Sequence, residues 1–114
     1  MHRHLVVILA VALAACGKQD DAEKLTKSVD SWRATLQLVA DARLRNEVRG
    51  RFALNTIEAA VEELSSKAAK PGLPRSITVR AETVIGAAAN LRRAVERDDR
   101  AAIARARSEL AGSR

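Results

Sequence analysis

The sequence predicts an all-α protein, a small antiparallel up-down helical bundle with three long helices and a short fourth helix. Three observations lead to this prediction. Apolar residues recur at helical spacing almost from one end of the chain to the other. Aromatic residues make up only 2% of the chain, and there is little of the β-branched alternation that strands require. Changes of phase and turn-forming residues divide the helical pattern into separate segments.

The first predicted helix carries an apolar stripe whose members are alternately four and three residues apart. The stripe consists of Leu25, Val29, Trp32, Leu36 and Val39. Asp20 and Glu23 fit a capping pair at the start of this helix, because their carboxylates can accept hydrogen bonds from free backbone N–H groups. Further along, the same stripe would place Arg43 and Asn46 in the core. We therefore expect the helix to end or bend within residues 45–50.

The later helices are separated by a proline–glycine turn and by a pair of aspartates. The second stripe, out of register with the first, consists of Leu54, Ile57, Val61, Leu64 and Ala68. Pro71 and Gly72 should stop this helix, because proline lacks an N–H and glycine tolerates left-handed backbone. The third stripe consists of Ile77, Ala81, Val84, Ala88, Leu91 and Val95. Asp98 and Asp99 would cap a short fourth helix. The apolar face of that helix consists of Ile103, Ala106 and Leu110.

The N-terminal segment has the layout of a secretory signal peptide. Arg3 lies in a short basic head, and residues 5–15 form an apolar run. This run is shorter than the roughly 20 apolar residues that a transmembrane helix needs. The layout therefore predicts export from the cytoplasm.

The end of this segment, Leu13-Ala14-Ala15-Cys16, resembles the lipobox of bacterial lipoproteins. The resemblance implies cleavage between Ala15 and Cys16, with a diacylglycerol on the thiol and an N-acyl lipid, such as palmitate, on the new N-terminus. The chain then divides into a signal peptide at 1–15, a lipidated N-terminus and short tether at 16–20, and a helical bundle domain at 21–114. The implied partners are the membrane and the lipoprotein processing and sorting machinery.

Two alternatives concern where the processed protein resides. Ordinary cleavage after Ala14 would leave a soluble protein with a free thiol, which is a liability in an oxidising compartment. Among Gram-negative lipoproteins, an aspartate directly after the cysteine resembles an inner-membrane retention signal. Gly17 holds that position here. The resemblance therefore favours the outer membrane, facing the periplasm, over the inner membrane.

The chain that follows Ala15 lacks the side chains of most metal and nucleophile chemistry. His2, His4 and Met1 all lie in the predicted signal peptide, and the sequence contains no tyrosine. Histidine is the commonest general base and metal ligand near neutral pH, and haem iron needs an axial His, Met, Cys or Tyr. We therefore expect no metal, no cofactor apart from the lipid on Cys16, and no enzymatic activity.

Arginines gather around two of the predicted turns, in a chain with a formal charge of +6. They are Arg43, Arg45, Arg49 and Arg51 near the first turn, and Arg92, Arg93, Arg97 and Arg100 near the third. In an up-down bundle anchored at its N-terminus, both turns lie at the end far from the membrane. The arginines would form a basic pole there, and guanidinium groups bind carboxylates and phosphates well.

A solvated helix face is the alternative explanation for several of these arginines. Asp41, Glu47 and Glu96 each lie four residues before an arginine and can pair with it: Arg45, Arg51 and Arg100, respectively. Arg43, Arg49 and Arg93 have no carboxylate four residues before them. The residues predicted to bind a partner are therefore Arg43, Arg49 and Arg93.

Glu58 and Glu62 share a helix face and could serve acid–base or glycosidic chemistry. No cleft is indicated around them, and Glu63 lies four residues before Lys67, as in a solvated ion pair. The carboxylates are therefore interpreted as a solvated surface.

The sequence favours a lipid-anchored adaptor that binds another envelope protein or an anionic polymer through its basic pole. The alternative is a small-molecule-binding bundle, with an apolar ligand between the helices near Trp32, although a core position is the default for this tryptophan. Phe52 either covers the end of the bundle or is an exposed partner contact. Nucleic acid is not expected as a partner, because export separates it from the protein and no stacking aromatic lies among the basic residues.

Overall fold

The computed structural model describes the backbone of residues 2–113 and the side chains of residues 20–113. Four helices account for the regular structure of these residues, and the predicted all-α class is confirmed. They are α1 (His2–Leu44), α2 (Gly50–Ala68), α3 (Arg75–Glu96) and α4 (Arg100–Gly112).

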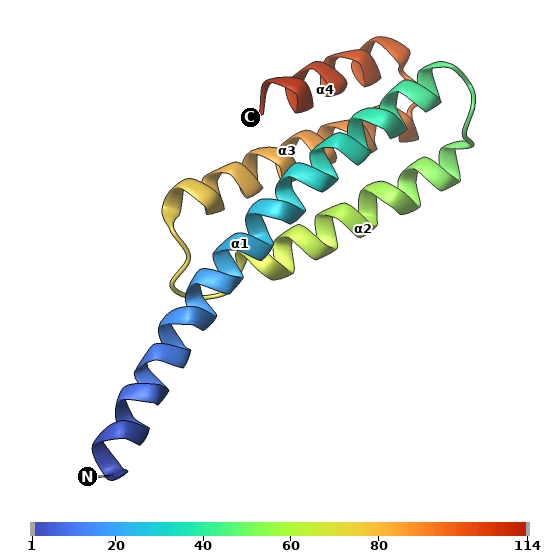
Figure 1. The fold of residues 1–114 in the computed structure, drawn as a ribbon. Coiled ribbons are helices and arrows are strands. Elements are labelled where there is room, and N and C mark those ends of the chain that lie inside the picture. Colours follow the sequence, from blue (N-terminus) through green and yellow to red (C-terminus); the bar gives the residue numbers. More distant parts are fainter. Residues whose placement is uncertain (1, 114) are drawn as a thin grey trace.

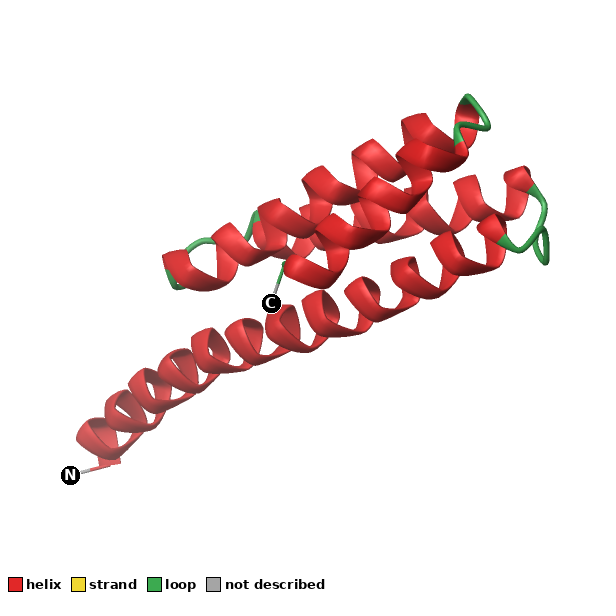
Figure 2. Ribbon diagram, turned by 90° about the horizontal axis from the view of Figure 1, so that it is seen from above, coloured by secondary structure: helices red, strands yellow, loops and turns green. Residues whose placement is uncertain are grey.

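The chain reverses its direction at each of the three turns (Figure 1). The α1–α2 turn and the α3–α4 turn lie together at one end, which we call the turn end, and the α2–α3 turn lies at the other (Figures 1 and 2). α1 also contacts α3 and α4, so the helices enclose one core. α4 has only 13 residues, against 22 in α3, and covers only the part of the bundle near the turn end.

The first helix is longer than the sequence indicated. α1 runs for 43 residues, and its N-terminal part projects beyond the bundle (Figure 2). The predicted cap at Asp20 and Glu23 is wrong, because the helix continues through Asp20 and leaves no free backbone N–H groups there. Asp20 instead forms an ion pair with Lys24 at 3.0 Å. The predicted lipobox, with Ala15 and Cys16, lies outside the residues whose side chains are described.

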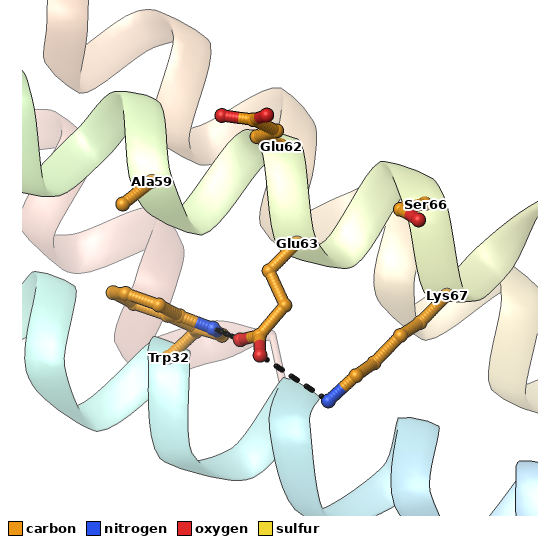
Figure 3. A pocket seen from close by; sticks show the side chains of 6 residues that line it. All are labelled: Trp32, Ala59, Glu62, Glu63, Ser66 and Lys67. Carbon is orange, nitrogen blue, oxygen red and sulfur yellow. Dashed lines mark hydrogen bonds and ion pairs between the residues drawn. The ribbon is translucent and has the colours of Figure 1, made fainter.

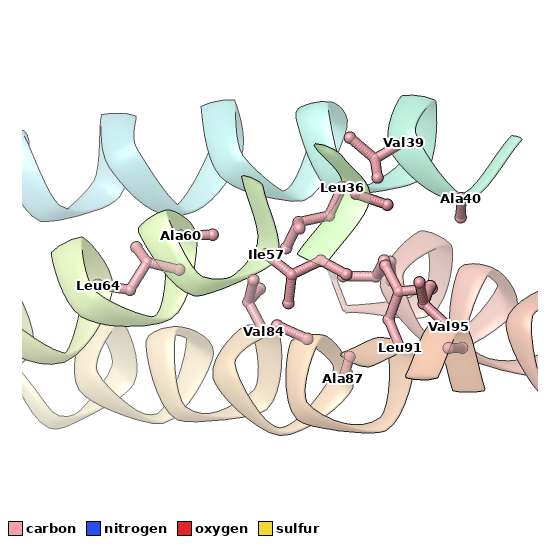
Figure 4. Packing of buried hydrophobic residues seen from close by; sticks show 14 of the residues in the cluster. Leu36, Val39, Ala40, Ile57, Ala60, Leu64, Val84, Ala87, Leu91 and Val95 are labelled. Atoms are coloured by element: carbon pink, nitrogen blue, oxygen red, sulfur yellow. The ribbon is translucent and has the colours of Figure 1, made fainter. Parts of the chain in front are cut away.

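The predicted stripes of α1, α3 and α4 supply most of the core (Figure 4). The buried members are Leu25, Val29, Leu36, Val39, Ala81, Val84, Ala88, Leu91, Val95, Ile103, Ala106 and Leu110. Trp32 and Ile77 are only partly buried and pack against the edge of this cluster. Helical spacing therefore identified the inward faces, but not the depth of every residue.

The buried face of α2 is rotated from its predicted position. Ile57 and Leu64 are buried as expected, together with two residues outside the predicted stripe, Ala53 and Ala60. The remaining members, Leu54, Val61 and Ala68, are only partly buried. The rotation follows from packing, because α2 contacts both α1 and α3 and its small alanines let these helices approach closely.

The two turns at the turn end close in the same way. The backbone is left-handed at Asn46 (φ 58°) and at Asp98 (φ 51°), a conformation that Asn and Asp tolerate better than most residues. Asn46 N–H donates to Arg43 O at 3.1 Å. The next N–H, that of Glu47, donates to Ala42 O at 2.8 Å. This is the Schellman arrangement, and the α3–α4 turn repeats it with bonds of 3.1 and 3.0 Å.

The two aspartates of the α3–α4 turn have different roles. Asp99 caps α4 as predicted, because its Oδ1 accepts a hydrogen bond from Ala102 N–H at 3.1 Å. Asp98 does not cap the helix, since its left-handed backbone belongs to the end of α3 and its carboxylate pairs with Arg43. In the α2–α3 turn, α2 ends at Ala68 and Gly72 is left-handed (φ 81°), in agreement with the predicted stop.

Candidate functional site

Arg43 joins the two turns of the turn end. Its Nη2 donates to Asp98 Oδ1 at 3.1 Å, and its Nη1 donates to Val48 O at 3.3 Å. The side chain is only 18% exposed. Of the three arginines predicted to bind a partner, Arg43 is therefore already occupied by contacts within the chain.

Two arginines of α4 add further connections to α1. Arg100 donates to Leu44 O, and Arg107 Nε pairs with Asp41 Oδ1 at 2.5 Å. The hydrogen bond that Arg107 donates to Asp41, together with the negative charge of that carboxylate, raises the pKa of Arg107 above its ordinary value. The turn end is thus held together by side chains from different helices.

The predicted pairs along single helices are replaced at two positions by other partners. Asp41 pairs with Arg107 of α4 and not with Arg45. Glu96 pairs with Arg92, four residues earlier, at 2.9 Å, and not with Arg100. The prediction was wrong at these positions because packing brings competing partners within reach. Among the described residues, Glu47 and Arg51 form no ion pair with each other.

Phe52, for which the sequence left two roles open, is exposed. Its side chain is 57% exposed at the start of α2. It shares a shallow hollow of about 490 Å³ with the residues of the α1–α2 turn, and we call this region the Phe52 surface. The surface consists of Glu47, Val48, Arg49, Arg51, Phe52 and Asn55. Arg49, a predicted binding residue, therefore lies beside an exposed aromatic ring.

Arg93, the third predicted binding residue, lies in a different place. It lines a groove of about 200 Å³ between α3 and α4, which we call the arginine groove. The groove is lined by Asn90, Arg93, Ala94, Arg97, Asp99, Ala102, Arg105, Ala106 and Glu109. Arg105 was not assigned to any site from the sequence, where the only signal was the recurrence of arginine between alanines in residues 100–107.

A third hollow lies beside Trp32, between α1 and α2 (Figure 3). We call it the Trp32 groove; its volume is about 490 Å³, and it is lined by Trp32, Ala59, Glu62, Glu63, Ser66 and Lys67. Trp32 reaches the surface here, and its indole N–H donates to Glu63 Oε2. The indole lies at the edge of the core and not inside it, because its N–H needs a polar partner.

Glu63 and Lys67 of the Trp32 groove are bound to each other and to neighbouring side chains. Glu63 Oε1 pairs with Lys67 Nζ at 3.3 Å, which confirms the predicted pair, and Lys67 Nζ also donates to Ser28 Oγ at 2.7 Å. The hydrogen bond from Trp32, with a smaller contribution from Lys67, lowers the pKa of Glu63 below its ordinary value of 4.5.

Glu58 and Glu62 do not form a catalytic pair in this arrangement. Glu58 pairs with Arg92 of α3 at 2.9 Å. Glu62 lines the Trp32 groove and points away from Glu63 (Figure 3). The two carboxylates therefore have different surroundings.

Comparisons with known proteins add no identification: no protein-family model, curated protein or solved structure matches the chain. Within the part of the chain that the structure describes, no helix is both long and apolar enough to span a membrane. The same residues include no cluster of three or more His, Cys, Asp or Glu side chains that could bind a metal ion.

Proposed function

We propose that this chain is the precursor of a lipid-anchored envelope lipoprotein, and that its domain, an antiparallel up-down bundle, is a non-enzymatic adaptor. The lipobox resemblance supports lipidation of Cys16 and a location in the outer membrane, facing the periplasm. The adaptor would bind another envelope protein at the turn end, opposite its anchor. The observation that carries this proposal is the Phe52 surface.

The composition of the Phe52 surface favours a protein partner. Phe52 is 57% exposed and lies beside Arg49 and Arg51. Aromatic residues and arginine are enriched at protein–protein interfaces, where they supply contact area together with directional hydrogen bonds. A partner with an apolar side chain and neighbouring carboxylates would complement this surface.

The turn end is also preorganised for binding. Arg43 connects the α1–α2 turn to Asp98, and Arg100 connects α4 to the last residue of α1. Contacts that hold both turns in place before binding reduce the conformational entropy that a partner must overcome. The turn end can therefore present the Phe52 surface without rearrangement of the bundle.

In-cell photo-crosslinking tests the adaptor proposal. A photoreactive residue at Asn55, on the Phe52 surface, should capture one dominant envelope protein, whereas the same residue at Ser76, at the opposite end of the bundle, should not. Arg49→Glu together with Arg51→Glu should abolish the adduct, and Arg75→Glu is a control that reverses a charge away from the turn end. Equal capture from Asn55 and Ser76 would contradict the proposal.

The lipid anchor requires its own test. Intact mass measurement of membrane-extracted protein should show a chain that begins at Cys16 and carries a diacylglyceryl group and an N-acyl group. Cys16→Ser should remove both lipids and release the protein from the membrane. An unmodified Cys16 in the membrane fraction would contradict this part of the proposal.

Binding of a small molecule is the second candidate function, and the Trp32 groove favours it. Its volume of about 490 Å³ falls within the range of about 300–1,000 Å³ found for ligand pockets. Trp32 is the only tryptophan, so its fluorescence would report directly on a ligand in this groove. A saturable change in that fluorescence with an apolar ligand, lost in Ala59→Glu, would support this function over the adaptor.

A further inference from the structure

We propose that the arginine groove between α3 and α4 binds a phosphate group. This site is separate from the protein partner proposed above and does not depend on it. The inference comes from three arginines that face one small groove, from the state of the carboxylates beside them, and from the alanines between the two helices.

The positive side of the groove consists of Arg93, Arg97 and Arg105. Arg93 lies in the last turn of α3, Arg97 is the C-cap residue that follows this helix, and Arg105 lines the groove from α4. The ion pairs of the described residues involve none of these three guanidinium groups. The three arginines outnumber the two carboxylates of the lining, Asp99 and Glu109, so the groove keeps a net positive charge that a bound anion can neutralise.

The two carboxylates in the lining accept hydrogen bonds from neutral donors. Glu109 Oε2 accepts from Asn90 Nδ2 at 2.9 Å, which closes the groove across α3 and α4. Asp99 Oδ1 accepts from Ala102 N–H at 3.1 Å as the cap of α4. Asn90 Oδ1 in turn accepts a hydrogen bond from Arg93. The carboxylates therefore hold the walls of the groove in place and form no ion pairs with its arginines.

Small side chains between the helices give the groove its space. Ala94 and Ala106 are almost completely buried, and Ala102 is partly buried against the core. Larger residues at these positions would fill the space between α3 and α4. The alanines thus allow an anion to lie between arginines from both helices.

The size and charge of the arginine groove favour a phosphate group as its ligand. A volume of about 200 Å³ is below the range of about 300–1,000 Å³ for pockets that enclose a whole small molecule, so the groove fits a single group. A carboxylate has two oxygens in one plane, and one guanidinium can bind both of them. A phosphate monoester carries about two negative charges and three strong acceptor oxygens, which suits three guanidinium groups on two sides.

Calorimetric titration of the full chain, in neutral detergent, with inorganic phosphate tests the inference. Arg105→Gln should weaken phosphate binding about tenfold, because a hydrogen bond to a charged group is lost. The control Arg75→Gln removes the same charge at the opposite end of the bundle and should leave the affinity within about twofold. Absence of phosphate binding, or equal weakening by both substitutions, would overturn the proposal.

A second variant separates the groove from the general charge of the protein. Ala102→Leu fills the groove and leaves every arginine in place, so it should abolish phosphate binding while helical circular dichroism is retained. If a folded Ala102→Leu protein binds phosphate as the unmodified chain does, the groove is not the site.

Vesicles identify the source of the phosphate group. Stronger binding to vesicles with phosphatidic acid than to pure phosphatidylcholine, reduced by Arg105→Gln but not by Arg75→Gln, would assign the groove to a lipid headgroup. Binding of inorganic phosphate without this vesicle preference would assign it to a soluble phosphate compound.

Discussion

The Trp32 groove and the arginine groove lie between neighbouring helices of one bundle, but their charges are arranged differently. In the Trp32 groove, Glu63 binds both the indole of Trp32 and the ammonium group of Lys67. In the arginine groove, the carboxylates bind neutral donors and the guanidinium groups are left without ion pairs among the described residues. Lys67 of the first groove is therefore paired with a carboxylate of the same groove, whereas the guanidinium groups of the second groove are not.

This difference bears on how arginine-rich surfaces can be interpreted. Arg43, Arg100 and Arg107 all contact acceptors elsewhere in the chain and stabilise the turn end. Arg49, Arg93 and Arg105 instead line hollows of the surface. Local sequence does not separate the two sets, because the acceptors Asp98, Leu44 and Asp41 of the first set are distant in sequence from their arginines.

The largest expected effect comes from removing the side chain that anchors α4. Ile103 is fully buried, and Ile103→Ala should lower the free energy of unfolding by about 3 kcal/mol through lost burial and a cavity. Urea denaturation of the full chain measures this change. The substitution should also abolish phosphate binding, because the arginine groove needs α4, and leave the Trp32 fluorescence spectrum almost unchanged.

The matched control is Ile103→Val, which removes one methylene group and should lower the free energy of unfolding by about 1 kcal/mol. Equal losses from the two substitutions would show that α4 is not held by this side chain. A large change in the Trp32 spectrum would show that the two grooves are not structurally independent.

A smaller effect is expected from the cap that closes one end of the arginine groove. Asp99→Ala removes the acceptor for Ala102 N–H and should cost about 1 kcal/mol in the free energy of unfolding. Asp99→Asn keeps an acceptor and should recover most of that loss. Urea denaturation compares the three proteins, and equal stability of the two variants would contradict the capping role.

The sequence predicted the helical class and most of the core because apolar spacing is a local property of each helix. It placed Ile103, Ala106 and Leu110 on the inner face of α4 and predicted the cap at Asp99, and both predictions are confirmed. It failed at Asp20, because spacing alone does not show that a helix continues through a good capping residue. The α2 face was also misplaced, because two neighbouring helices determine its rotation.

The site residues were less predictable than the fold. Arg43, Arg49 and Arg93 were grouped by their distance from a carboxylate along the chain, but the structure gives them three different surroundings. Arg43 could not be recognised as a contact between turns, since Asp98 is distant in sequence. Arg105 could not be assigned to a groove before the packing of α4 on α3 was known.

The Trp32 groove should respond to acid through Glu63. The folded-state pKa of Glu63 lies below its ordinary value of 4.5, so its contribution to stability is present above that pH and is lost as the pH falls through the folded-state pKa. Trp32 fluorescence should therefore change in acid below pH 4.5. Glu63→Gln should remove this transition, and its persistence would exclude Glu63 as the titrating group.

The smallest expected effects concern single charges in the two grooves, and they should differ in sign. Lys67→Gln removes an ion pair and a hydrogen bond with Ser28, and it should lower the free energy of unfolding by a few tenths of a kcal/mol. Arg105→Gln removes one of three like charges without breaking an ion pair, so stability should be unchanged or slightly higher at low salt. Thermal unfolding at low and high salt compares the two variants.

If the groove is a binding site, added phosphate should make the Arg105→Gln protein the less stable of these two variants. The Lys67→Gln protein keeps Arg105, so the bound anion stabilises its folded state more strongly. A destabilised Arg105→Gln protein in phosphate-free buffer would show instead that Arg105 has a structural partner, and the contrast between the grooves would no longer hold.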